Sequence, residues 1–155
     1  MDFNSISEIL DFAIEKEKEA AEFYQNVSEQ EEFIDKKQMM LEFAAEERKH
    51  QSMLEDLKAG NTDQHLDDYP FKWITDIKRS DYVDEIEYHS GMGYSDLLLM
   101  AMKREEKALK LYNDMLSKAE SDAQKKLFKM LCQEEAKHKL ALETMFDDFM
   151  AEMGD

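Results

Sequence analysis

The chain contains only four glycines and one proline among its 155 residues. Both residue types interrupt helices, so their scarcity leaves long stretches in which a helix can continue. Glutamate, lysine, leucine, methionine and alanine, which favour helices, are abundant instead. The sequence therefore predicts an all-α protein, and its length is sufficient for one domain, 1–155, with a hydrophobic core.

Cysteine is almost absent as well, since Cys132 is the only one. A single cysteine excludes an internal disulfide, and the lack of a Cys-x-x-Cys pair excludes a rubredoxin-type or zinc-ribbon module in this sequence. The sequence has no apolar run long enough to cross a membrane, and its N-terminus has neither the basic start nor the apolar stretch of a signal peptide. We therefore expect a soluble, cytoplasmic protein in which Cys132 is a buried structural thiol.

Positive charge is scarce, with 20 lysines and arginines against 37 aspartates and glutamates and a net charge of −17. Binding to nucleic acids or to anionic membranes requires basic side chains that neutralise phosphates, so we expect neither partner. Most of the acidic side chains are expected to keep a solvated surface soluble.

Four long helices are predicted, and their ends carry recognisable signals. Ser5-x-x-Glu8 and Ser121-x-x-Gln124 are typical of capping boxes that begin a helix, and Gly60 is placed to end one. The predicted helices span about 5–28, 33–58, 95–119 and 122–150.

The segment between the second and third helices, 61–92, is different in composition and contains the only proline, Pro70. We interpret it as a long crossover with a short amphipathic helix of its own near 73–88. Two helical hairpins with short turns, joined by one long crossover, are the connectivity of a ferritin-like four-helix bundle.

The predicted core positions of each helix are apolar or aromatic except near the middle of the helix, where glutamates and histidines occupy them. An ionised carboxylate in a dry core costs several kcal/mol unless it is paired, protonated or bound to a metal. The basic residues nearby in sequence are adjacent to these positions and so point about 100° away around the helix. Two divalent cations would balance four carboxylates, with neutral imidazoles as further ligands. The six candidate metal ligands are Glu17, Glu47, His50, Glu105, Glu135 and His138.

An internal repeat supports this set, because the second hairpin repeats the pattern of the first 88 residues later. Glu17 is followed by Glu105 (105 − 17 = 88), Glu47 by Glu135 and His50 by His138 at the same interval. One glutamate from each of two helices and Glu-x-x-His from each of the other two is the ligand arrangement of di-iron and di-manganese carboxylate bundles. The alternative is an acidic bundle whose helical phase is shifted by one residue.

Two motifs each occur twice: Glu17-x-x-Ala20-x-x-Phe23-Tyr24 matches Glu105-x-x-Ala108-x-x-Leu111-Tyr112, and Glu46-Glu47-x-x-His50 matches Glu134-Glu135-x-x-His138. These motifs resemble those of the rubrerythrin group of the ferritin-like superfamily. The resemblance covers all four helices and implies that Glu17 and Glu105 are terminal ligands, that Glu47 and Glu135 bridge two metal ions, and that His50 and His138 bind one metal each. It also implies that two tyrosines lie beside the site as candidate catalytic residues, although ordinary core packing explains them almost equally well.

The sequence departs from this family pattern in two ways. The rubredoxin domain of full-length members has no counterpart here, so a separate electron donor is expected. The additional third-helix glutamate of those members is also missing, because Met102 and Ala108 occupy the corresponding positions. In that family, efficient peroxide reduction is associated with a redox-linked exchange of ligands, and neither Met102 nor Ala108 can take part in it as a carboxylate.

The leading hypothesis is a non-haem di-iron oxidoreductase that reduces hydrogen peroxide or dioxygen and uses two iron ions. Manganese or zinc would also suit the ligands, although zinc offers no redox chemistry. One alternative is a ferroxidase that stores iron in a many-subunit cage, and another is a non-catalytic metal-binding bundle. The resemblance also implies a homodimer.

Overall fold

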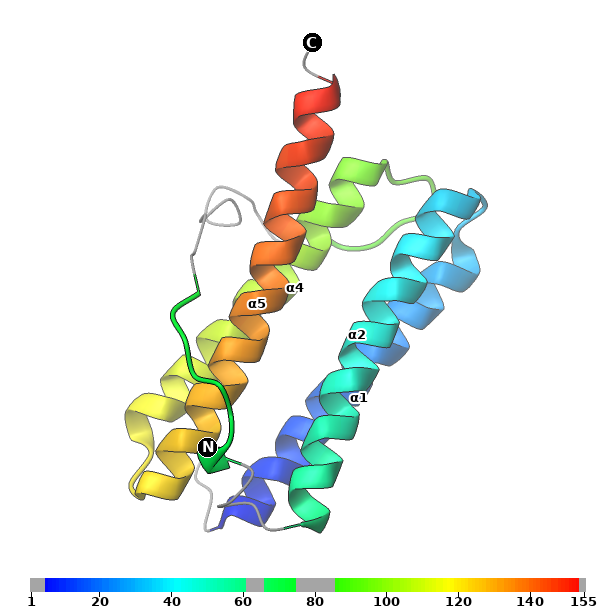
Figure 1. Ribbon diagram of the computed structural model, residues 1–155. Coiled ribbons are helices and arrows are strands. Elements are labelled where there is room, and N and C mark those ends of the chain that lie inside the picture. Colours follow the sequence, from blue (N-terminus) through cyan, green and yellow to red (C-terminus); the bar gives the residue numbers. More distant parts are fainter. Residues whose placement is uncertain (1–4, 61–65, 75–85, 154–155) are drawn as a thin grey trace. The chain divides into compact units, whose positions relative to one another are not determined.

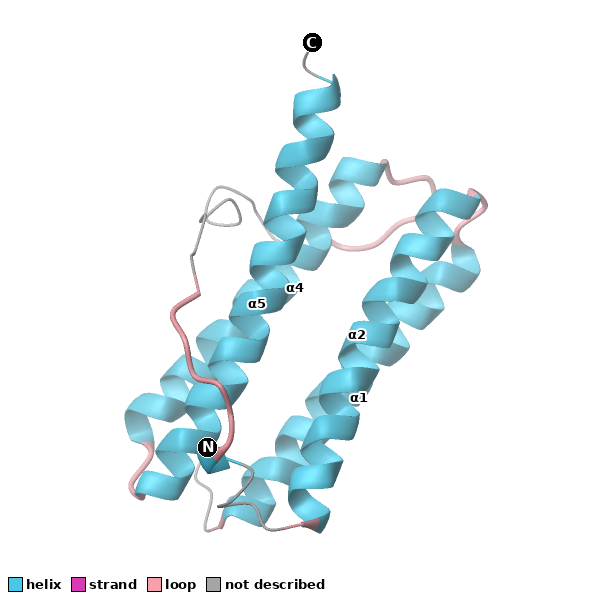
Figure 2. Ribbon diagram, viewed as in Figure 1, coloured by secondary structure: helices cyan, strands magenta, loops and turns pink. Residues whose placement is uncertain are grey.

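The computed structural model describes residues 5–60, 66–74 and 86–153. Within these ranges the regular structure consists of helices, and no strand occurs (Figure 2). The four long helices are α1 (Ile6–Gln30), α2 (Ile34–Ala59), α4 (Tyr94–Lys118) and α5 (Asp122–Met153), as Figure 1 shows. The prediction of an all-α chain with four long helices is confirmed, and the last helix extends three residues beyond its predicted end at 150 (153 − 150 = 3).

The chain forms two compact units, Met1–Asp68 and Tyr69–Asp155, and each contains one helical hairpin. In the first, α1 and α2 pack together, and the ring of Tyr24 on α1 meets that of Phe43 on α2 edge to face, with 5.5 Å between centroids. In the second, α4 packs on α5, and the rings of Tyr94, near the start of α4, and Phe149 of α5 are tilted by 37°, with 4.8 Å between centroids. Aromatic pairs at such centroid distances add to the stability that apolar burial provides.

Serine caps begin the first and last helices, as the sequence predicts. The Ser5 hydroxyl accepts a hydrogen bond from the Glu8 N–H at 3.2 Å, and the Ser121 hydroxyl accepts one from the Gln124 N–H at 3.1 Å. Each bond satisfies one of the N–H groups that have no partner within the helix. At the other end of the first hairpin, Gly60 follows the last residue of α2, and its N–H donates to the carbonyl of Asp56 at 3.0 Å.

Replacing Ser121 by alanine removes the cap of α5 without changing any buried contact. We expect the free energy of unfolding to fall by about 1 kcal/mol, the usual effect of losing an N-terminal serine cap. Urea denaturation followed by circular dichroism measures this difference. Ser121→Asp is the control, because its carboxylate restores the acceptor; if the two variants are equally destabilised, the cap contributes nothing.

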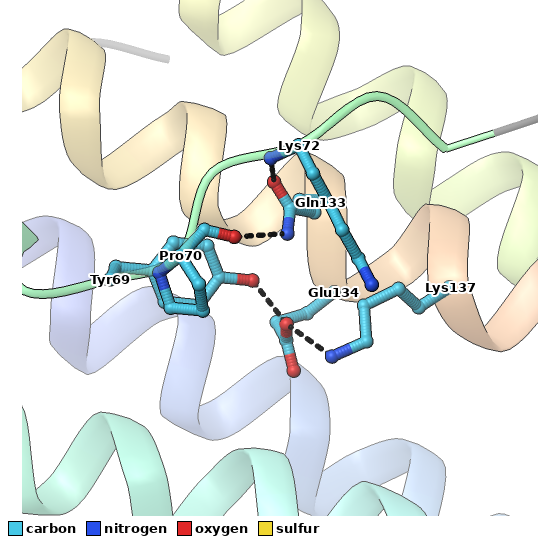
Figure 3. Close-up of polar contacts among 6 residues, drawn as sticks. All are labelled: Tyr69, Pro70, Lys72, Gln133, Glu134 and Lys137. Atoms are coloured by element: carbon cyan, nitrogen blue, oxygen red, sulfur yellow. Dashed lines mark hydrogen bonds and ion pairs between the residues drawn. The ribbon is translucent and has the colours of Figure 1, made fainter.

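The crossover between α2 and α4 is only partly described. The short helix predicted near 73–88 lies mostly outside the described residues, and the described positions on either side of that gap, 73–74 and 86–88, are not helical. Residues 69–72, which precede the gap, run alongside α5 within the second unit (Figure 3). This segment is in contact with the turn of α5 that leads into the candidate ligands.

Candidate metal centre

The first hairpin brings three of the six candidate ligands together. Glu17 extends from the middle of α1, while Glu47 and His50 lie one turn apart on α2. The His50 Nδ1 atom is 3.6 Å from a Glu17 carboxylate oxygen and 3.7 Å from a Glu47 carboxylate oxygen. Each residue offers one ligand atom that lies within 4.8 Å of those of the other two.

The second hairpin carries the other three candidates at the equivalent positions of its two helices. Glu105 comes from α4, and Glu135 and His138 lie one turn apart on α5. The His138 Nδ1 atom is 3.0 Å from a Glu105 carboxylate oxygen. All six candidate ligands, in both hairpins, are between 1% and 7% exposed.

The six candidate ligands lie on the buried side of their helices, as the spacing of the apolar positions in the sequence predicts. The four basic residues that directly precede a candidate ligand in sequence are exposed, by contrast, and only Lys139, which follows His138, is buried among the described basic neighbours. Two of the four exposed residues form surface ion pairs with glutamates on their own helices: Lys16 with Glu19 at 3.7 Å and Lys49 with Glu46 at 3.6 Å. A shift of the pattern by one residue would have buried the basic side chains instead, so that alternative is wrong. The four exposed neighbours are Lys16, Lys49, Arg104 and Lys137.

The chemistry of these side chains fits divalent metal ions. Each hairpin supplies two carboxylates and one imidazole, and no lysine or arginine is buried among the described residues of the first hairpin. Buried carboxylates that approach an imidazole nitrogen this closely require positive charge nearby. Oxygen ligands with a smaller number of imidazoles suit iron or manganese, and zinc also accepts them.

The two candidate catalytic tyrosines are both completely enclosed, with Tyr24 on α1 and Tyr112 on α4. Each lies seven residues after a candidate ligand, two turns further along the same face of its helix. The Tyr24 ring packs edge to face against Phe23 and Phe43, at 5.5 Å from each. This packing is what a core aromatic residue would show, and it also holds the ring in one orientation.

Met102 occupies the position where the family pattern has an additional glutamate. It is completely buried one turn before Glu105 on α4, and Ala108, one turn after Glu105, is half-buried. A thioether and a methyl group therefore flank the Glu105 carboxylate along its helix, and neither offers a carboxylate ligand.

Comparison with known proteins supports the family suggested by the sequence motifs. The sequence model described as Rubrerythrin matches residues 8–146. The chain belongs to the rubrerythrin family. A hypothetical protein from Pyrococcus furiosus is similar in structure, with a TM-score of 0.52, 24% sequence identity, and coverage of 93% of this chain and 89% of that one. No curated protein matches the chain significantly. The predicted ferritin-like four-helix fold, with its single long crossover, is thus confirmed.

Family membership and the clustered glutamate and histidine side chains together indicate a di-metal site in this rubrerythrin-family chain. None of the helices in the described part of the chain combines the length and hydropathy needed to cross a lipid bilayer.

A buried ion pair on α5 was not predicted from the sequence. Lys139 directly follows the candidate ligand His138, and its ammonium lies 3.1 Å from the Glu143 carboxylate one turn later. The two residues are 3% and 0% exposed. Their i, i+4 spacing is common on exposed helical faces, so nothing in the sequence distinguished this pair from a surface pair.

The contact of segment 69–72 with Glu134 of α5 was not predicted from the sequence either. Tyr69 donates a hydrogen bond to the Glu134 carboxylate. Partial burial, this hydrogen bond and the negative charge of Glu134 raise the pKa of Tyr69 well above its usual value, so the phenol stays protonated and remains a donor. A crossover residue and a helical glutamate separated by 65 positions give no periodic signal.

Cys132 is half-buried on α5, and its Sγ atom lies 3.4 Å from the side-chain oxygen of Asn113 on α4. Burial, with a further contribution from the charge of Glu135, raises the pKa of the thiol to about 12. The reactive thiolate is therefore scarce at neutral pH, in agreement with a structural thiol.

Proposed function

We propose that this chain is a non-haem di-iron oxidoreductase that reduces hydrogen peroxide or dioxygen with electrons from a separate donor. The observation that carries the proposal is the burial of four glutamates and two histidines, in two sets of matching composition, within a chain of the rubrerythrin family. No other group of described residues combines so many buried carboxylates with imidazoles.

In this proposal each hairpin contributes half of the ligands. Glu17 and His50 would hold one ion, Glu105 and His138 would hold the other, and Glu47 and Glu135 would supply further carboxylates. The short distances from each histidine nitrogen to a glutamate oxygen, 3.6 Å to Glu17 and 3.0 Å to Glu105, support this pairing. Four carboxylates balance the charge of two divalent ions.

Bound ferrous iron would supply the two electrons that, with two protons, convert one molecule of hydrogen peroxide into two molecules of water. The protein must exclude bulk water and deliver protons. The burial of the ligands accomplishes the first task. We assign the second to the hydroxyl groups of Tyr24 and Tyr112, which are held two turns from a ligand on the same helical face.

The electron donor is proposed to be a separate molecule. We further propose that the protein acts as a homodimer in the cytoplasm. The missing carboxylate at Met102 and Ala108 favours a slower reaction with peroxide than in relatives that have it.

The test is stopped-flow oxidation of the protein after anaerobic loading with ferrous iron. We expect hydrogen peroxide or dioxygen to oxidise two ferrous ions per chain and to produce near-ultraviolet absorption. Substituting both Glu47 and Glu135 by glutamine should abolish this reaction, because two of the four charges that hold the ions are lost. The matched control substitutes Glu19 and Glu46, which lie in exposed surface ion pairs, by glutamine and should react as the wild type does.

The alternatives give different results in the same experiments. A purely metal-binding bundle would take up two ions, yet its iron would stay ferrous for minutes in the presence of either oxidant. An iron-storage protein would oxidise iron but form a cage of many subunits, which mass measurement in solution detects at once. Either result would contradict the proposed function.

A further inference from the structure

Segment 69–72 is attached to α5 by the side chain of one buried glutamine (Figure 3). The Gln133 carbonyl oxygen accepts a hydrogen bond from the Lys72 N–H at 2.9 Å, and its amide nitrogen donates to the Pro70 carbonyl at 3.0 Å. Both polar ends of the side chain are thus used, and both bind main-chain atoms of the segment. This double contact fixes the distance between the segment and the helix.

The next residue of α5 makes a second attachment. The Glu134 carboxylate accepts the hydrogen bond from the Tyr69 hydroxyl, and the same oxygen accepts one from the Lys137 ammonium at 3.2 Å. The Tyr69 ring packs edge to face on Phe71, with 4.8 Å between centroids, which orients the phenol. Hydrogen bonds to an ionised carboxylate are about twice as strong as those between neutral groups.

The two attachment points immediately precede the candidate ligand Glu135 and lie within one and a half turns of His138. Restraining the backbone at Gln133 and Glu134 restrains the direction in which the next side chains leave the helix. Removing a group that orients a metal ligand in this way commonly lowers the metal affinity by 10- to 100-fold.

The first hairpin has no equivalent attachment among its described residues. The positions 88 residues earlier are Ala45 and Glu46 (133 − 88 = 45 and 134 − 88 = 46). Alanine has no hydrogen-bonding side chain, and Glu46 forms an exposed ion pair with Lys49 at 3.6 Å. The internal repeat therefore preserves the candidate ligands of both hairpins but provides the attachment only in the second.

We propose that segment 69–72 is a positioning element that holds Glu135 and His138 ready for metal, so that the two ions of the proposed centre bind with unequal affinity. The inference rests on the proposed function. The ion bound by Glu105 and His138 is the tighter one, because its ligands need less ordering when the metal arrives. Tyr69, Gln133 and Glu134 act through the α5 backbone and are positioning residues.

The experiment is a cobalt(II) titration of the metal-free full-length chain, followed by calorimetry and by visible absorption. We expect two steps. His138→Ala should remove the tighter step and His50→Ala the weaker one, which assigns each step to a hairpin. Tyr69→Phe, which keeps the ring and loses only the hydroxyl, and Gln133→Ala should each weaken the tighter step about 10-fold and leave the weaker step unchanged.

Glu134→Gln and Glu46→Gln form a matched pair, because each removes one charge at equivalent positions of the repeat. Only Glu134→Gln should weaken the tighter step, and Glu46→Gln should stay within twofold of the wild type. Gln133→Glu keeps the acceptor for the Lys72 N–H and should fall between Gln133→Ala and the wild type. Helicity is recorded for every variant, and Tyr69→Phe decides the matter if Gln133→Ala does not fold.

Two kinds of result would overturn the inference, and they are distinguishable. If the wild type binds two ions but Tyr69→Phe and Glu134→Gln change neither step, or change both steps equally, segment 69–72 does not position the ligands, and the proposed function is unaffected. If the wild type shows no cobalt binding that depends on His50 and His138, the metal centre itself is wrong, and this inference fails with it.

Discussion

Replacing Glu143 by glutamine is expected to lower the free energy of unfolding by about 3–5 kcal/mol. Glu143 is 0% exposed, and its carboxylate lies 3.1 Å from the Lys139 ammonium, which is 3% exposed. Glutamine fits the same space but removes the negative charge that Lys139 contacts. A buried charge that loses its counter-charge is strongly destabilising, whereas an exposed one is solvated by water.

The internal repeat provides a matched control for this substitution. The equivalent positions in the first hairpin are Gln51 and Glu55 (139 − 88 = 51 and 143 − 88 = 55), and the Gln51 amide donates to the Glu55 carboxylate at 2.8 Å on an exposed surface. Glu55→Gln should change the free energy of unfolding by no more than about 0.5 kcal/mol. Chemical denaturation of both metal-free variants measures the difference.

A double variant separates the loss of charge from the loss of packing. Substituting Lys139 by methionine and Glu143 by leucine replaces the ion pair with apolar side chains of similar size, and we expect most of the lost stability to return. If Glu143→Gln is as stable as the wild type, the pair is reached by water, and the burial argument is wrong.

Metal loading is expected to raise the melting temperature of the wild-type protein. An ion that binds only the folded state at 100 times its dissociation constant adds about 2.7 kcal/mol. For a domain of this size that corresponds to a rise of about 5–10 °C. The stabilisation arises because the metal supplies the positive charge that the buried glutamates need. Differential scanning calorimetry with and without manganese(II) measures it.

The variant with both Glu47→Gln and Glu135→Gln should show almost no such rise, since two of the four candidate carboxylate ligands are gone. Without metal it should melt no lower than the wild type, because it buries two fewer charges. An equal rise in the variant and the wild type would show that the metal stabilises the protein from another site, away from Glu47 and Glu135.

The helices and the candidate ligands were accessible from the sequence because both depend on local periodicity. A run of helix-forming residues with apolar positions three and four apart determines which side of each helix is buried. The six candidate ligands occupy that side, and the exposure of Lys16 and Lys49 confirms the phase. The serine caps of α1 and α5 are equally local, since each involves residues three positions apart.

The contacts of the crossover were not accessible in this way. The region of Trp73 was predicted from the sequence to be part of a short helix, yet residues 69–74 are not helical, and 69–72 run beside α5 (Figure 3). The hydrogen bonds between the Gln133 side chain and the main chain of residues 70 and 72 join positions about sixty residues apart. No periodic pattern encodes such a pairing, since any exposed glutamine on a helix would look the same.

The sequence alone thus determined the four helices, their inward faces and the repeated Glu and His pattern, because each follows from the geometry of a single helix. The tertiary structure decided that Lys139 and Glu143 form a buried pair while Gln51 and Glu55 stay exposed, although the repeat places them at equivalent positions. It also decided that segment 69–72 attaches to α5. Burial and long-range hydrogen bonds depend on what packs against a residue, and that is a property of the folded chain.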